Sequence, residues 1–259
     1  HVSCLAEQAK ILVAEAEERN LDDVKWERWY TCSLCEQHYH GVVRCALGWA
    51  CWKTYLGRPE METVRGFAMQ QLGSGLSAAS HNEDALSVKE AELSMEQRLG
   101  ASESNILVAK GNLAGTYRSL GRFEECSRMQ QDVYSGRLKL DGKEHEKTLV
   151  AAINYAASLL DLERFEEVRS LLRRTIPVAR RVLGDGDRLT FQMRKAYAQS
   201  LFMDADATLD DLHEAATTLE EAERVARRVL GASHPVTLAI GNHLRNARAA
   251  LRARETPPR

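Results

Sequence analysis

The sequence has few prolines and aromatic residues, almost no net charge and no long apolar run. Five prolines and 6% aromatics in 259 residues, beside 44% hydrophobic residues, exclude a collagen-like or disordered chain and indicate a globular protein. A formal net charge of −2 gives no general attraction to nucleic acid, because such binding needs clustered basic residues that meet many phosphates. We therefore expect no nucleic-acid partner.

The most apolar stretch, residues 42–52, is far shorter than the roughly 20 residues that a membrane-spanning helix needs, and it contains Arg44. We therefore expect no membrane partner. The chain begins with His1 rather than Met and shows no basic-then-apolar leader. These features predict a fragment or a processed product that is cytoplasmic by default, with the nucleus as the alternative.

Cysteine and tryptophan are nearly absent after residue 52, which indicates two chemically different parts. The first 52 residues hold five of the six cysteines and all four tryptophans: Cys4, Cys32, Cys35, Cys45, Cys51, Trp26, Trp29, Trp49 and Trp52. We interpret Cys45 and Cys51 as core residues of a helix over 41–56, and Trp49 and Trp52 as packing this helix onto the first repeat. In a reducing compartment, clustered cysteines are more often metal ligands than disulfides.

The rest of the chain repeats with a period of about 42 residues. Gly57, Gly100, Gly142, Gly184 and Gly231 are spaced by 43, 42, 42 and 47 residues, and large apolar residues recur seven and thirteen residues after the last four. Each unit predicts a helix A, a short turn, a helix B and a closing glycine in the left-handed conformation. Because one hairpin cannot bury its apolar face, stacking is expected to give an all-α solenoid, a right-handed superhelix whose concave wall consists mainly of A helices.

Three irregularities are expected in this array. Residues 204–208 lengthen the turn of the fourth unit, and Pro177 falls inside a helix B. A last helix, from about His234 to Arg254, has no partner helix B and is rich in arginine. Arginine doublets such as Arg227-Arg228 are interpreted as solvated helix faces with internal ion pairs rather than as a phosphate-binding surface.

Several short motifs of the repeat carry a resemblance to a known family. They are 112–114 (Asn-Leu-Ala), 154–156 (Asn-Tyr-Ala), the Arg-Phe-Glu-Glu turns at 122–125 and 164–167, and the segment 230–238. In combination they resemble the tetratricopeptide repeats (TPRs) of the kinesin light chain type, over residues 59–254. Two places depart from the pattern, namely Met69-Gln70-Gln71 in the first unit and Ala196 in the fourth.

The resemblance implies that a peptide or partner protein binds in the concave groove. In related repeats, an Asn of helix A hydrogen-bonds the backbone of the ligand, which is a contact that tolerates many sequences. Asn112 and Asn154 match this position, and Lys110 and Lys195 are candidates for contacts with acidic side chains. The alternative is that all four are ordinary exposed polar residues.

The front end holds two pairs of metal-ligand type, His1-x2-Cys4 and Cys32-x2-Cys35, with an aromatic residue, Tyr39, after the second pair. Residues 1–40 resemble the C-terminal half of a RING zinc finger of the RING-CH variant. The resemblance implies that His1 and Cys4 are its third ligand pair and that Cys32 and Cys35 are its fourth.

The RING is cross-braced, so zinc would bind only if two further ligand pairs precede residue 1. Leu5 to Glu18 is interpreted as an inserted helix between the two pairs. The cysteines could instead be buried packing thiols of a degenerate hairpin, or a redox pair. The expected organisation is a partial finger over 1–40, a helical junction over 41–58, the TPR array over 59–254 and a tail over 255–259.

No motif for a self-contained active site is present: there is no Gly-rich phosphate loop, nucleophile elbow or His-Glu-x2-His helix. His81, His213 and His243 are scattered, and His145 and His234 sit where they would cap A helices. The sequence therefore favours a protein-interaction scaffold without its own catalysis. The alternative is the substrate-recognition part of a RING-type ubiquitin ligase, which would also bind a ubiquitin-conjugating enzyme. A motor adaptor is less well supported, because no heptad region is present.

Overall fold

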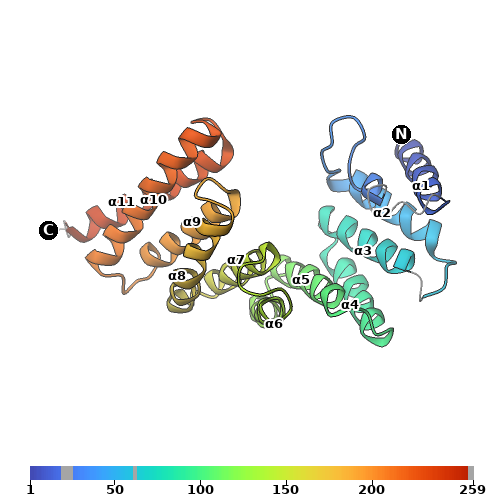
Figure 1. Cartoon of the computed structure of the whole chain (residues 1–259), viewed down its shortest axis with the longest axis horizontal. Coiled ribbons are helices and arrows are strands. Elements are labelled where there is room, and N and C mark those ends of the chain that lie inside the picture. Colours follow the sequence, from blue (N-terminus) through green and yellow to red (C-terminus); the bar gives the residue numbers. More distant parts are fainter. Residues whose placement is uncertain (19–25, 61–62, 256–259) are drawn as a thin grey trace. The chain divides into compact units, whose positions relative to one another are not determined.

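A computed structural model describes residues 1–18, 26–60 and 63–255 of the chain, and most of these residues are helical (Figure 1). These residues form eleven α-helices and one short 3-10 helix. The helices are α1 (Val2–Glu18), η1 (Trp26–Trp29), α2 (Gly41–Tyr55), α3 (Thr63–Ala78), α4 (Asn82–Arg98), α5 (Glu103–Ser119), α6 (Phe123–Asp141), α7 (Glu146–Asp161), α8 (Phe165–Val182), α9 (Arg188–Phe202), α10 (Leu209–Leu230) and α11 (Pro235–Glu255).

The chain divides into two compact units, one from His1 to Cys126 and one from Ser127 onward. In the first unit, α2 packs along α3, α3 on α4 and α4 on α5. In the second unit, successive helices from α7 to α11 pack on each other, and the A helices α7, α9 and α11 also contact one another in turn. Both units therefore consist of stacked helical hairpins, as the sequence period predicts.

The ends of the repeats follow the predicted pattern, with one exception. Positive φ values at Gly100, Gly142, Gly184 and Gly231 confirm the left-handed conformation that closes a helix B. Gly57 does not adopt it, so the prediction is wrong at the first boundary. The predicted histidine caps are confirmed: Nδ1 of His145 accepts the backbone N–H of Lys147 at 3.1 Å, and Nδ1 of His234 accepts that of Val236 at 3.2 Å.

Helix α1 packs against the 3-10 helix η1 and against α2 in the first unit. The predicted helix over 5–18 is confirmed, but it begins at Val2, so Cys4 lies in its first turn. Ala9 and Val13 are buried against Trp29 and Leu47. Burial of these apolar side chains holds α1 on α2 although a long segment separates the two helices.

Helices α2 and α3 approach each other closely through glycines. A Cβ atom on Gly48 would lie 2.7 Å from the carbonyl oxygen of Gln71, and one on Gly75 would lie 2.8 Å from that of Arg44. Cys51 is buried, as expected, whereas Cys45 is only half-buried. Trp52 packs against the cores of this unit. Trp49 is 43% exposed, so its predicted packing role is wrong.

A buried arginine links the 3-10 helix, α2 and α3. Arg44 donates to the carbonyl oxygen of Trp29 at 3.0 Å and to Oε1 of Gln71 at 2.6 Å, and its guanidinium lies over the ring of Tyr30. Burial lowers the pKa of Arg44 to about 10. Gln71, which departs from the Asn-Leu-Ala pattern, is therefore the acceptor that this arginine requires.

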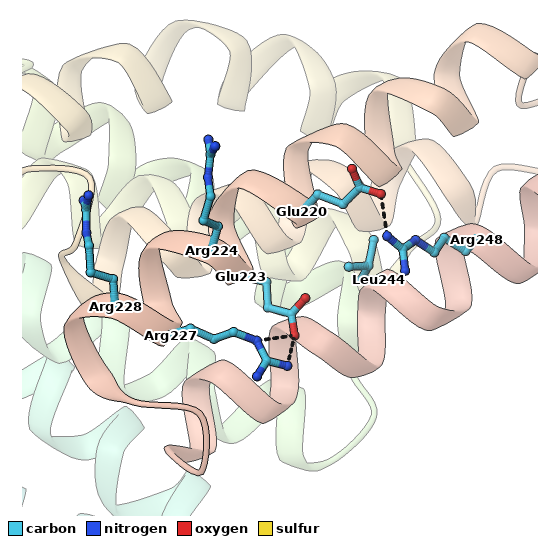
Figure 2. A pocket seen from close by; sticks show the side chains of 7 residues that line it. All are labelled: Glu220, Glu223, Arg224, Arg227, Arg228, Leu244 and Arg248. Atoms are coloured by element: carbon cyan, nitrogen blue, oxygen red, sulfur yellow. Dashed lines mark hydrogen bonds and ion pairs between the residues drawn. The ribbon is translucent and has the colours of Figure 1, made fainter.

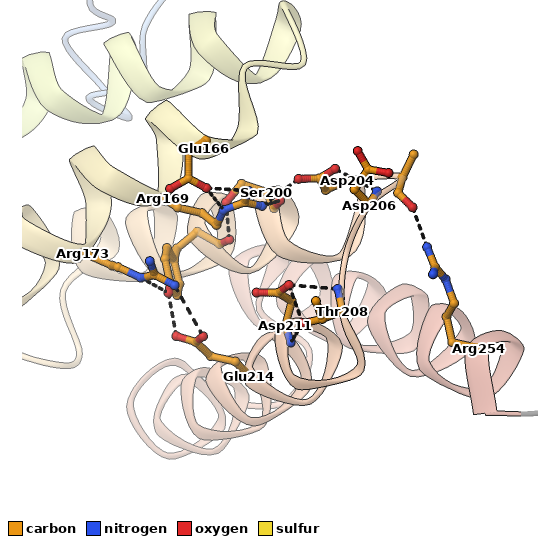
Figure 3. A network of polar contacts seen from close by, with 12 residues as sticks. Glu166, Arg169, Arg173, Ser200, Asp204, Asp206, Thr208, Asp211, Glu214 and Arg254 are labelled. Carbon is orange, nitrogen blue, oxygen red and sulfur yellow. Dashed lines mark hydrogen bonds and ion pairs between the residues drawn. The ribbon is translucent and has the colours of Figure 1, made fainter.

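In the second unit, α10 is held on α8 and α9 by polar contacts that Figure 3 shows in part. Arg173 donates to the hydroxyl of Tyr197 at 2.8 Å, and that hydroxyl donates to Glu214 at 2.6 Å. Farther along the same interface, the buried Arg194 of α9 donates to the carbonyl oxygen of Thr218 at 3.1 Å and to Glu221 at 2.9 Å. Carboxylates of α10 thus bind arginines of the two preceding helices.

The long turn between α9 and α10 is also held in place. Arg169 of α8 donates to the carbonyl oxygen of Ser200 at 3.0 Å and to Asp204 at 2.9 Å (Figure 3). Thr208 and Asp211 then form a capping box that begins α10. Pro177 lies inside α8, as predicted.

Two ionisable residues of α4 are buried in the first unit. Nζ of Lys89 donates to Thr116 Oγ1 at 2.7 Å, to Ser77 Oγ at 2.9 Å and to the carbonyl oxygen of Asn112 at 3.2 Å. Burial lowers the pKa of Lys89 to about 8 and raises the pKa of Glu92 to about 7. Lys89 therefore joins α3, α4 and α5, whereas Glu92 carries a desolvation cost.

Replacing Glu92 by Gln is expected to change the pH dependence of stability. Between its ordinary value of 4.5 and about 7, the folded state keeps a proton that the unfolded state releases, so Glu92 lowers stability as the pH rises through this window. Urea titrations at pH 4.5 and 7.5 measure the loss of stability between these pH values. For Glu92→Gln this loss should be smaller than for the wild-type chain, by on the order of 2 kcal/mol. Glu83→Gln, an exposed site on the same helix, is the control. If Glu92→Gln and the wild-type chain lose the same stability between the two pH values, the buried state of Glu92 is contradicted.

Replacing Arg169 by Met is expected to destabilise the second unit by about 2 kcal/mol, because Ser200 and Asp204 lose charge-assisted hydrogen bonds. Chemical denaturation measures this loss, and the exposed Arg174→Met on the same helix is the control. Equal effects of the two substitutions would argue against a special role of Arg169.

Candidate functional site

Two of the predicted peptide-binding residues lie on A helices of the second unit. Asn154 is exposed on α7, and Lys195 is half-buried on α9, the helix that packs beside α7. Lys195 lies close enough to His243 of α11 to contribute to lowering the pKa of that histidine, although burial is the larger cause. His243 Nδ1 lies 3.0 Å from the carbonyl oxygen of Ala239.

His243 is a residue of this surface that the sequence pattern did not single out. It stands twelve residues after its closing glycine, the position that holds Asn112, Asn154 and Ala196 in the preceding units. An alignment of the repeats at their closing glycines therefore places His243 in the same column as the two asparagines. The ring of His243 packs edge-on against Phe202 at a centroid distance of 6.3 Å. The structure thus brings Lys195 and His243 together on neighbouring A helices.

The other two predicted residues, Asn112 and Lys110, lie on α5 in the first unit, and both are half-buried. The carbonyl oxygen of Asn112 accepts the ammonium of Lys89, so the backbone at this position belongs to the core. The two Asn positions belong to different units, and each unit therefore offers a candidate surface of its own.

An exposed valine precedes each of these asparagines by one helical turn. Val108 is 41% exposed and Val150 is 40% exposed, four residues before Asn112 and Asn154 respectively. Residues four apart share one face of a helix. Helices α5 and α7 therefore each offer an apolar side chain and an amide side by side, which suits contact with a peptide that has alternating apolar and polar groups.

The predicted metal ligands Cys32 and Cys35 lie in a tight turn of the first unit. The backbone N–H of Leu34 points at Cys32 Sγ at 3.5 Å, and the N–H of Glu36, a residue with φ of 56°, donates to the carbonyl oxygen of Cys32 at 3.0 Å. An antiparallel bridge between Thr31 and His38 closes the turn. Hydrogen bonds from the backbone of Cys35 and Leu34 lower the pKa of Cys32.

The backbone N–H groups of Leu34 and Cys35 thus favour the thiolate form of Cys32, which is the form of cysteine that binds zinc. His1 and Cys4 lie at the start of α1, and both are exposed. No three His, Cys, Asp or Glu residues gather as a metal site within the ranges that the structure describes. The alternative of buried packing thiols is wrong for this set, because Cys4 and Cys35 are exposed and Cys32 is only half-buried.

The surface also carries a hollow of about 620 Å³ between α10 and α11 (Figure 2). Its lining is charged apart from Leu244 and consists of Glu220, Glu223, Arg224, Arg227, Arg228, Leu244 and Arg248. None of the predicted peptide-binding residues lines it. The hollow is therefore a second candidate site.

Comparison with known proteins agrees with this architecture. Residues 105–181 match the family model of the tetratricopeptide repeat. The structure of BtubC (BKLC) from P. vanneervenii is similar at a TM-score of 0.62 and 14% identity, over 83% of this chain and 94% of that one. The fold is that of a TPR solenoid. The predicted all-α solenoid is confirmed.

Two structures of nearly identical TPR-like repeats of a Podosopora anserina protein, described as a kinesin light chain, are also similar. One has a TM-score of 0.61 at 13% identity, over 88% of this chain and 97% of that one. The other has a TM-score of 0.54 at 13% identity, over 100% and 99%. No curated protein matches the chain. At these identities the similarity concerns the fold, and the family match includes no residue of the Cys-rich front end.

Among the helices of the described ranges, none is both long and apolar enough to cross a bilayer.

Proposed function

We propose that the chain is a protein-interaction scaffold that binds a peptide or a partner protein on the exposed faces of its A helices. The observation that carries this proposal is the repeated pair of an exposed valine and an asparagine on α5 and α7. Stacked helical repeats offer extended surfaces of this kind for partners, and the fold matches such repeats.

The chemistry of these residues suits a peptide backbone. An Asn side chain offers an acceptor and two donors, so it can pair with the N–H and C=O groups that every peptide contains. Lys110 and Lys195 would attract acidic side chains of the ligand, and His243 beside Lys195 would add a further polar contact. The ligand is thus expected to be an extended peptide with at least one carboxylate, and the scaffold is proposed to act in the cytoplasm.

In separate variants, replacing Asn112 or Asn154 by Ala should weaken about tenfold the binding of a peptide that occupies that unit, because the variant loses a pair of hydrogen bonds to the ligand. The probe is a peptide selected by phage display on the wild-type chain, and fluorescence anisotropy gives its affinity. Asn105→Ala with Asn246→Ala, both exposed on A helices, is the matched control. Unchanged affinity at an unchanged melting temperature would reject the assignment.

A second candidate function is the substrate-recognition part of a RING-type ubiquitin ligase, and the Cys32–Cys35 turn favours it. Zinc would be held by this pair and by His1 and Cys4, each pair completed by ligands that precede residue 1. Bound zinc would shape a platform for a ubiquitin-conjugating enzyme. Such ligases act by proximity, so the chain would supply no catalytic side chain.

Zinc content tests this second function. A longer chain that includes the residues encoded before His1 should hold two zinc ions per molecule by atomic emission after dialysis. Cys32→Ser with Cys35→Ser should lose one of them, whereas Cys45→Ala, at a half-buried helix position, should keep both. A longer wild-type chain without zinc would reject the finger and would leave the scaffold function untouched.

A further inference from the structure

A pocket of the first unit combines apolar walls with two arginines, unlike the charged hollow of the second unit. It has a volume of about 330 Å³ and is lined by side chains of α2, α3 and α4. Its apolar lining includes Trp52 of α2, Met69 of α3 and Met95 of α4. Met95 is buried, and the other two are half-buried. A cavity of this size with apolar walls and a few polar groups is of the kind that holds small organic ligands.

The charged residues that line the pocket carry one positive charge in excess. They are Arg65 of α3, Arg98 of α4 and Glu60, which precedes α3. One carboxylate oxygen of Glu60 lies 2.7 Å from Nη2 of Arg98, and the other lies 3.7 Å from Nη2 of Arg65. All three side chains are partly exposed. The pocket therefore favours a ligand with a single negative charge.

The guanidinium of Arg65 is held in place but only partly hydrogen-bonded. Its Nη1 donates to the carbonyl oxygen of Arg58 at 3.1 Å, and its Cζ lies 5.9 Å from the centroid of the Trp52 ring. Nε is buried and has no hydrogen-bond partner among the described residues. Nη2 approaches Glu60 only at 3.7 Å, which is longer than a hydrogen bond.

Nε and Nη2 form the edge of an arginine that binds both oxygens of a carboxylate. In Arg65 this edge makes no hydrogen bond to the described residues, and a buried N–H group without an acceptor costs free energy. A ligand carboxylate that takes the place of Glu60 would face this edge and Arg98 together. The polar side of the pocket is thus suited to a carboxylate.

The apolar side of the pocket is suited to an aromatic ring. The sulfur atoms of methionines make favourable contacts with aromatic rings, and the flexible side chains of Met69 and Met95 can adapt to the shape of a ring. The indole of Trp52 adds a further aromatic surface beside them. The volume is sufficient for one ring and a short acid group.

We propose that the pocket formed by α2, α3 and α4 binds an aromatic monocarboxylate. The carboxylate of the ligand displaces Glu60 and pairs with Arg65 and Arg98, while the ring packs on Met69 and Met95. This chemistry has two sources, a free aromatic acid or the carboxyl-terminal aromatic residue of another chain. The proposal does not depend on the peptide-binding surfaces of α5 and α7, so the failure of either leaves the other standing.

N-acetyl-L-phenylalanine is the first probe, because it carries one phenyl ring and one carboxylate. The indole N–H signal of Trp52 in ¹⁵N NMR spectra, assigned with Trp52→Phe, should shift in a saturable way. A ligand of about 15 non-hydrogen atoms is expected to have a Kd of about 0.5 mM. The amide of the same compound lacks the charge and should bind at least tenfold more weakly. Tighter binding of the peptide Gly-Gly-Gly-Phe would identify a chain terminus as the source, and weaker binding would identify a free acid.

Variants of two matched ion pairs decide the outcome. Arg98→Met should weaken binding at least fivefold, whereas Glu60→Gln should strengthen it about threefold, because the ligand no longer competes with a carboxylate. Arg122 and Glu125 form an ion pair at 2.8 Å in the same unit and do not line the pocket, so Arg122→Met and Glu125→Gln should leave the Kd within twofold. Equal losses from Arg98→Met and Arg122→Met, or weaker binding to Glu60→Gln, would overturn the proposal. So would equal binding of the acid and its amide, or no shift at about 10 mM probe.

Discussion

The structure depends on one constraint, namely that a helical hairpin of this length cannot bury its own apolar face. Each helix is stable only because the next one covers it, so stability is a sum of neighbour interfaces. Where two helices meet, small residues permit close approach, as Gly48 and Gly75 do between α2 and α3. The surfaces available for partners are those that these interfaces leave uncovered.

Buried polar side chains help to fix the register of neighbouring helices, because apolar packing alone is less specific about how the helices align. Arg44 and Lys89 each bond groups on two neighbouring elements, and Arg194 bonds two groups of α10. Because an unpaired buried polar group costs free energy, each of these residues favours one register of its helices over others. Lys89 bonds the carbonyl oxygen of Asn112, so the packing of the first unit also fixes the helix that carries a proposed ligand contact.

The sequence predicted the hairpins because their determinants are local: periodic apolar residues, closing glycines and capping histidines. It failed where an outcome depends on residues distant in the chain. Gln71 departs from the repeat because it serves Arg44, which stands 27 residues earlier in the chain. Trp49 was expected to pack α2 onto the first repeat together with Trp52, but helix periodicity alone did not determine which tryptophan faces α3. The column of Asn112 and Asn154 contains His243, but its proximity to Lys195 of another helix could not be predicted from the sequence.

The same constraint separates covered surfaces from open ones. On α9, Tyr197 and Leu201 lie beneath α10, whereas the corresponding Leu244 and Arg248 of α11 line a hollow. The two helix pairs have the same arrangement, but the residues at the surface change from apolar to charged. An apolar surface favours a permanent covering helix, because its exposure to water costs free energy. A charged surface tolerates water, because exposed ion pairs stay hydrated, so one arrangement of helices gives a buried interface in one place and an open charged surface in the next.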